Sequence, residues 1–93
     1  MARHAERLNV QGRVQGVGYR WWTMQAAAAL GLEGWVRNRR DGSVEILAIG
    51  HATAIEALHE SCREGPRGAV VLAVERYMAE DDGSVGFEER PTV

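Results

Sequence analysis

The pair Asp41-Gly42 constrains the fold of this chain more than any other short feature of its sequence. It divides the run GWVRNRRDGSVEILAIG, residues 34–50, into two segments with strand character. An Asp-Gly pair flanked by such segments is the strongest short-range signal for a β-hairpin. We therefore expect two antiparallel strands that are joined by a tight turn at Asp41 and Gly42.

The segment before this hairpin predicts one strand followed by one helix. Residues 8–14 alternate between apolar and polar side chains, as a strand buried on one face does. Residues 21–31 have the spacing of a helix that ends at Gly31. Its buried face is expected to consist of Trp22, Ala26, Ala29 and Leu30.

The segment after the hairpin predicts a second helix and a further strand. Residues 52–65 place Ile55, Leu58 and Cys62 on one helical face, which makes Cys62 a core residue rather than a nucleophile. Residues 69–80 then resume strand character. The charged segment 84–91 could add a short fifth strand at the edge of the sheet.

The order strand, helix, strand, strand, helix, strand is that of a ferredoxin-like βαββαβ sandwich. We expect an α+β fold with an antiparallel sheet, two helices on one face and a single domain over residues 1–93. In this topology the first two strands run parallel, with the third between them. The loop at 15–20 and Asn38 should therefore meet at one edge of the sheet.

The charge and hydropathy of the chain exclude several partner classes. Its formal net charge is -2, so nothing in the overall balance favours nucleic acid or an anionic membrane. No apolar run approaches the roughly 20 residues of a membrane span, and the amino end is charged. The single cysteine cannot form an internal disulfide, which fits a reducing compartment. We expect a cytoplasmic monomer.

The stretch GRVQGVGYR, residues 12–20, has the composition of an anion-binding loop. Gly16 and Gly18 leave backbone N–H groups uncovered where a helix begins, and the positive end of the helix dipole adds to them. Arg20 adds a planar guanidinium that can engage two phosphate oxygens. On spacing alone, a tight connection with a solvated Arg20 explains the stretch equally well.

Three segments resemble the acylphosphatase family. GRVQGVGYR is similar to that family's G-x-V-Q-G-V-x-aromatic-R loop, and GWVRNRRDGSVE to its G-W-V-x-N-x-x-D-G-x-V-E hairpin. GPRGAVVLAV is similar to its GP-x-x-A-x-V-x-x-V segment, so the resemblance covers roughly residues 8–88. Two mild departures are Ile49, where a glutamate is common, and Leu72, where a polar residue is frequent.

This resemblance implies the hydrolysis of acyl phosphates to a carboxylate and inorganic phosphate, without a metal or a cofactor. Arg20 then takes the role of the phosphate-binding arginine, and Asn38 orients the attacking water. The amides of the loop, residues Gln15, Gly16, Val17, Gly18 and Tyr19, bind the phosphoryl oxygens together with Arg20. The substrate is a small acyl phosphate, and inorganic phosphate is the product and a competitive inhibitor.

Several other residues allow more than one interpretation. The three histidines are too scattered for a metal site, and none forms an acid–base pair at helical spacing. Trp21 could shield the phosphate site or simply be partly exposed. The arginines around Asn38 make the hairpin soluble or steer an anionic substrate. They are Arg37, Arg39 and Arg40.

Two functions of other classes remain as alternatives, because fold does not fix function. RNA binding requires exposed aromatic residues on the central strands, and the first and third predicted strands offer none. A non-catalytic anion sensor would keep Arg20 and the glycine loop. It would have no reason to keep an asparagine that orients water.

Overall fold

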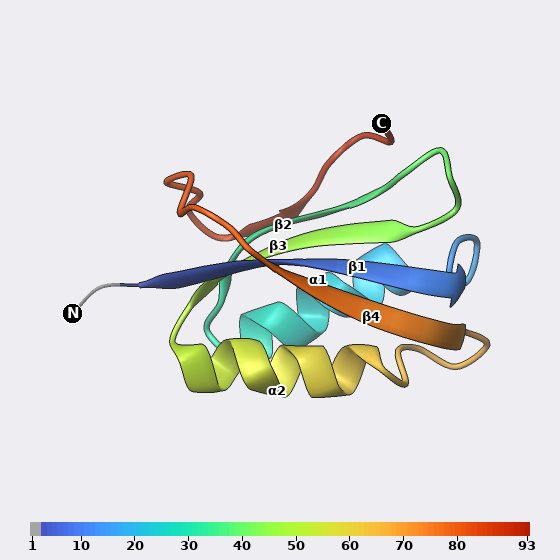
Figure 1. Cartoon of the computed structure of the whole chain (residues 1–93), viewed down its shortest axis with the longest axis horizontal. Helices are drawn as coiled ribbons and strands as arrows, with labels where there is room; N and C mark the ends of the chain where they lie inside the picture. The colour runs from blue at the N-terminus through green and yellow to red at the C-terminus, as the bar shows by residue number, and fades with distance from the viewer. Residues whose placement is uncertain (1–2) are drawn as a thin grey trace.

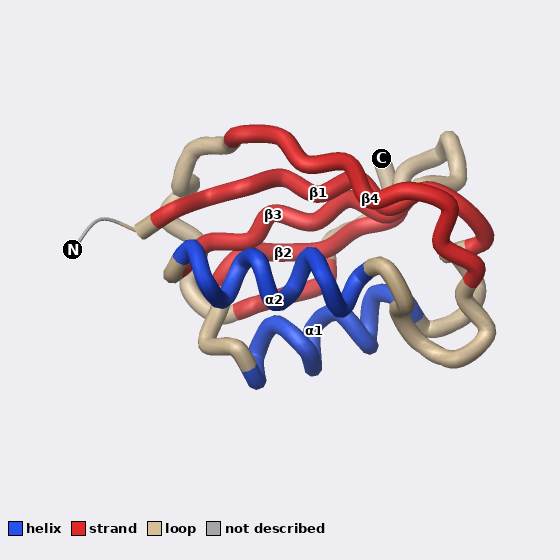
Figure 2. Tube along the Cα trace, turned by 60° about the horizontal axis from the view of Figure 1, so that its bottom comes forward, coloured by secondary structure: helices blue, strands red, loops and turns tan. Residues whose placement is uncertain are grey.

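The computed structural model describes residues 3–93. They form a five-stranded sheet with both helices on one of its faces (Figures 1 and 2). The elements are β1 (His4–Arg13), α1 (Tyr19–Ala29), β2 (Glu33–Asn38), β3 (Val44–Gly50), α2 (Ala52–Cys62), β4 (Val70–Met78) and β5 (Phe87–Glu89). The predicted βαββαβ order, the hairpin and the short edge strand are confirmed.

The sheet order is β4-β1-β3-β2-β5. Strand β3 pairs antiparallel with both β1 and β2, so β1 and β2 run in the same direction and end at the same edge. The prediction of an antiparallel sheet is wrong for β5, which pairs parallel with β2. After β4 the chain reverses direction once before it forms β5 at the far edge of the sheet. Strand β5 therefore runs opposite to β4 and in the same direction as β2.

The buried face of α1 differs from the predicted one. The fully buried residues are Tyr19, Thr23 and Ala27, whereas Ala29 is exposed. The predicted residues Trp22, Ala26 and Leu30 are only partly buried against the core. The helix begins at Tyr19, whose hydroxyl donates a hydrogen bond to the Cys62 carbonyl (2.6 Å). The Thr23 hydroxyl donates to the Tyr19 carbonyl (2.8 Å), which allows a polar side chain to be buried here.

The predicted face of α2 is confirmed, because Ile55, Leu58 and Cys62 are fully buried. They pack on the alternating residues of β1 and β3 that point towards the helices, which include Leu8, Val10, Val44, Ile46 and Ala48. Among the residues that the structure describes, no helix is long and apolar enough to cross a membrane.

The face of the sheet that the helices leave uncovered has a small apolar cluster of its own. Trp35, Leu47 and the completely buried Ile49 form it, so Trp35 lies on the face opposite the helices. Leu72 is 80% exposed on β4. The departure from the family pattern at Leu72 therefore leaves the core unchanged.

The burial of Cys62 predicts an unreactive thiol. Burial raises its pKa from about 9 to about 12. A thiol reagent at pH 8 should react at least about 100-fold more slowly with the folded protein than with the chain unfolded in guanidinium. The reason is that the thiolate is the nucleophile, and the raised pKa leaves less thiolate in the folded protein. Equal rates in the two states would contradict the burial.

The same pKa shift predicts a loss of stability in alkali. The contribution of Cys62 is fully present below about pH 9 and disappears as the pH rises to about 12, because the unfolded chain loses the thiol proton first. Denaturant titrations across this range should show a shallower decline for Cys62→Ala than for the wild-type protein.

Candidate functional site

The loop after β1 and the turn between β2 and β3 lie at the same end of the sheet (Figure 1). A pocket of about 150 Å³ opens between them. Its lining residues are Val14, Gln15, Gly16, Gly18, Tyr19, Arg20, Trp21, Asn38 and Glu89. The structure therefore brings together every predicted site residue except Val17, and it adds Val14, Trp21 and Glu89.

The loop turns into α1 through two glycines in the left-handed region. Gly16 has φ 76° and Gly18, the N-cap residue, has φ 81°. The first backbone bond of the helix runs from the Trp22 N–H to the Gly18 carbonyl (3.0 Å), so the amides of residues 18–21 point out of the helix end. The structure describes every residue of α1, and the first turn of this helix contains no acidic side chain. This helix end thus presents N–H donors and the positive end of the dipole to the pocket.

Gln15 holds the loop against the hairpin. Its side-chain amide donates to the carbonyls of Arg39 (2.7 Å) and Ser43 (2.9 Å). The two bonds join the start of the loop to the turn that follows Asn38. The Gln15 side chain is therefore used for structure, and the backbone amide is what Gln15 can offer to a ligand.

Arg20 is the second residue of α1, and its guanidinium is already paired with an acid. Arg20 Nη1 lies 3.0 Å from Glu89 Oε2, and the two side chains are 34% and 42% exposed. Glu89 was not predicted as a site residue. It comes from β5, where it pairs with Val36 of the neighbouring strand β2.

Asn38 is the last residue of β2 and is partly exposed in the pocket. Its backbone carbonyl accepts a hydrogen bond from the Val93 N–H (3.2 Å). Within residues 3–93, no group is hydrogen-bonded to its carboxamide. The turn is held instead by the Asp41 carboxylate, which accepts from the Ser43 N–H (2.9 Å) and hydroxyl (2.6 Å) and has a lowered pKa as a result. The Asn38 carboxamide is therefore available to a ligand.

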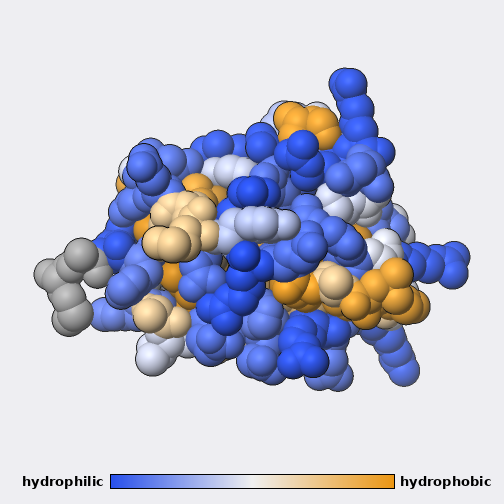
Figure 3. All heavy atoms as spheres, in the orientation of Figure 1, coloured by the Kyte–Doolittle hydropathy of each residue, from blue (hydrophilic) through white to orange (hydrophobic). Residues whose placement is uncertain are grey.

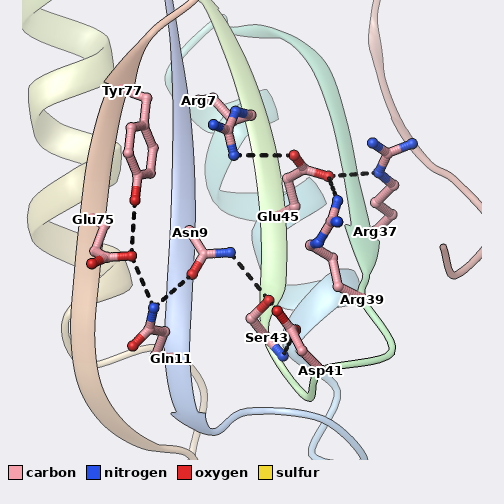
Figure 4. Close-up of polar contacts among 10 residues, drawn as sticks. All are labelled: Arg7, Asn9, Gln11, Arg37, Arg39, Asp41, Ser43, Glu45, Glu75 and Tyr77. Carbon is pink, nitrogen blue, oxygen red and sulfur yellow. Dashed lines mark hydrogen bonds and ion pairs between the residues drawn. The ribbon is translucent and has the colours of Figure 1, made fainter.

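Two of the arginines around Asn38, Arg37 and Arg39, point to the other face of the sheet (Figure 4). Arg37 Nε and Arg39 Nη1 lie 2.7 and 3.1 Å from Glu45 Oε1, and Arg7 Nη1 lies 3.3 Å from Oε2. Burial raises the pKa of Glu45, but the hydrogen bonds from Arg37 and Arg39 outweigh it and leave the pKa lowered. Arg37 and Arg39 therefore hold a nearly buried carboxylate, and neither of them lines the pocket.

This uncovered face of the sheet does not look like an RNA-binding surface. Its central strands carry polar side chains that bond to one another, such as Asn9 and Gln11 (Figure 4). Trp35 lies beneath the guanidiniums of Arg37 and Arg90, and the Arg7 guanidinium lies over the ring of Tyr77, which is 41% exposed. In the space-filling view this side is mainly hydrophilic, with an apolar area near the start of β4 (Figure 3).

The prediction that no histidine forms an acid–base pair at helical spacing is wrong for His59. His59 lies one helical turn from Glu56, and its Nδ1 is 3.6 Å from the Glu56 carboxylate. With Glu60 they form a group whose ligand atoms lie within 4.8 Å of one another. Glu56 is already paired with Arg76 (2.8 Å). None of the residues Glu56, His59 and Glu60 lines the pocket at Arg20.

Two further features complete the surroundings of the site. Trp21 lines the pocket with 64% of its surface exposed. A second hollow of about 410 Å³ lies at the opposite end of β2 and β3 and is lined by residues that include Arg3, Leu30 and His51. It contains none of the predicted site residues.

Comparison with known proteins points to one family. The sequence model of the acylphosphatase family matches residues 6–89, which include the pocket. An acylphosphatase of Rhizorhabdus wittichii is 48% identical over 94 residues, which cover 98% of this chain and 92% of that protein. The structure of an acylphosphatase from Coxiella burnetii has a TM-score of 0.91 at 34% identity and covers 96% of this chain and 94% of its own. The acylphosphatase structure from Bacillus subtilis has a TM-score of 0.89 at 36% identity, with 92% and 97% covered.

Proposed function

This chain belongs to the acylphosphatase family and hydrolyses acyl phosphates, and we propose that it does so in the pocket between the glycine loop, Arg20 and Asn38. The observation that carries this proposal is the meeting of three groups in one small pocket. They are the N–H groups at the start of α1, a guanidinium and a carboxamide without a partner among residues 3–93. The first two suit a phosphoryl group, and the third suits a water molecule.

The phosphoryl group of the substrate binds first to the loop. Backbone amides from residues 15–20 donate to its oxygens, and the helix dipole favours its negative charge. Arg20 adds a full positive charge and a planar pair of donors. Because these donors are fixed by the fold, they stabilise the transferring group without reorganising during the reaction.

Asn38 then orients the attacking water. The carboxamide oxygen accepts a hydrogen bond from the water and carries no charge that would repel the phosphoryl group. The water oxygen forms a bond to phosphorus, and the bond from phosphorus to the acyl oxygen breaks with its electron pair on the carboxylate. One proton of the water stays on the new P–OH group, and the other passes to a phosphate oxygen or to solvent. The products are a carboxylate and inorganic phosphate.

This chemistry makes modest demands on the protein. A carboxylate is a good leaving group, so positioning and electrostatic stabilisation can supply most of the rate enhancement. We therefore propose a reaction that uses neither a metal nor a cofactor, in a monomer that inorganic phosphate inhibits by competition. The cytoplasmic location stays a prediction from the sequence.

The proposed reaction is tested by an assay with benzoyl phosphate at neutral pH. The purified protein should hydrolyse it far above the spontaneous rate, and the rate should be unchanged by a metal chelator. Inorganic phosphate and sulfate should raise KM without lowering the maximum rate. Hydrolysis at the spontaneous rate would refute the function, and a loss of activity with the chelator would refute the metal-free mechanism.

A further inference from the structure

Glu89 is the one anionic side chain among the residues that line the phosphate pocket. We propose that its carboxylate is a resident counter-ion of Arg20, which lowers the affinity for phosphate and for acyl phosphates and so sets KM and product release. This inference rests on the proposed function of the pocket. Glu89 is then a residue of the pocket that weakens the binding of phosphate, whereas the loop amides and Arg20 strengthen it.

The position of Glu89 follows from the parallel pairing of β5 with β2. In this register Glu89 lies beside Val36 and Glu88 beside Trp35. Val36 points to the helices and Trp35 to the uncovered face, so neighbouring glutamates project to opposite sides of the sheet. Asn38 follows Val36 by two residues and therefore lies on the same side of β2. Glu89 thereby reaches the pocket, whereas Glu88 does not line it.

The contact between Glu89 and Arg20 is of a kind that a ligand can replace. It joins one guanidinium nitrogen to one carboxylate oxygen at 3.0 Å, and both side chains are more than a third exposed. Such an exposed ion pair contributes little to stability, because water and salt screen it. A phosphoryl group with two negative charges and several oxygens offers the guanidinium a better partner.

The charge balance of the pocket explains the expected effect on binding. The positive charge of Arg20 is neutralised by Glu89 until the phosphoryl group arrives. The ligand must then compete for Arg20 and accept a carboxylate as a neighbour. A unit charge about 4 Å away in water alters an affinity by roughly fivefold. The product phosphate meets the same repulsion, which favours its release.

The test compares Glu89→Gln with Glu88→Gln, which makes the same change of charge on the opposite face. Binding of inorganic phosphate is measured by calorimetry at low ionic strength, and KM is measured with benzoyl phosphate. Glu89→Gln should tighten phosphate binding and lower KM by about three- to tenfold. Glu88→Gln should change either value by less than about twofold. In 0.5 M NaCl the gain of Glu89→Gln should shrink, since the Debye length is then only about 4 Å.

The outcomes separate this inference from the function on which it rests. If Glu89→Gln binds phosphate no more tightly than Glu88→Gln, the counter-ion role is wrong while the pocket and its reaction stand. Weaker binding by Glu89→Gln would also overturn it, because the carboxylate would then position Arg20 for phosphate. Failure of the wild-type protein to hydrolyse benzoyl phosphate would instead overturn the proposed function. Equal melting temperatures of the two variants show that folding is not the cause.

Discussion

Arg20→Ala is expected to weaken phosphate binding and to lower kcat/KM for benzoyl phosphate by on the order of 1000-fold. In the proposed mechanism Arg20 contacts the phosphoryl oxygens in both the bound substrate and the transition state, so its loss should affect affinity and turnover together. The variant also leaves Glu89 in the pocket without its counter-ion. Steady-state kinetics and the inhibition constant of phosphate measure both effects.

Three comparisons make the Arg20 result specific. Arg20→Lys keeps the charge and loses the planar pair of donors, so it should recover only part of the lost activity. The double variant Arg20→Ala/Glu89→Gln should recover some phosphate affinity, because the unpaired carboxylate is gone. Arg63→Ala, which removes an exposed arginine outside the pocket, should leave both constants unchanged. Phosphate inhibition that persists unchanged in Arg20→Ala would contradict the assignment.

Asn38→Ala is expected to lower kcat by about 100-fold or more, while the affinity for inorganic phosphate stays close to the wild-type value. A group that orients the water acts on the transition state and has no part in holding phosphate. This separation from Arg20→Ala distinguishes an enzyme from a sensor that only binds the anion. The measurements are kcat and the inhibition constant of phosphate.

The variant Asn38→Asp adds a test of charge at nearly constant shape. A carboxylate beside the incoming phosphoryl group should repel it, so Asn38→Asp should lose the phosphate affinity that Asn38→Ala keeps. Both variants should unfold near the wild-type temperature, because Asp41 and Gln15 hold the turn. A normal kcat in Asn38→Ala, or a loss that only follows unfolding, would leave catalysis to Arg20 and the loop amides.

The alternation of the strands allowed much of this arrangement to be predicted from the sequence. Asn38 and Val36 lie on one side of β2, and Trp35 and Arg37 on the other. That alternation already contained the signal that Trp35, Arg37 and Arg39 point away from Asn38. Their partner Glu45 has the matching position on β3, where it pairs with Arg37.

Other features depend on contacts that alternation and helical spacing do not contain. The buried face of α1 is set by Tyr19, whose hydroxyl finds the Cys62 carbonyl at the end of α2. A pattern of apolar residues cannot reveal that Thr23 is buried with its hydroxyl satisfied. Glu89 was missed because β5 is short, and the partner and register of an edge strand are not encoded in its own three residues.

The central claim is that the phosphoryl group binds at the start of α1, beside Asn38. A titration of the ¹⁵N-labelled protein with inorganic phosphate, followed by two-dimensional NMR, tests it most directly. The amide signals of residues 16–20 and the Asn38 side-chain amide should shift and saturate together, and Arg20→Ala should strongly weaken the response. Saturable shifts confined to the hollow at Arg3 and His51, or no saturable shifts in residues 15–38, would contradict the claim.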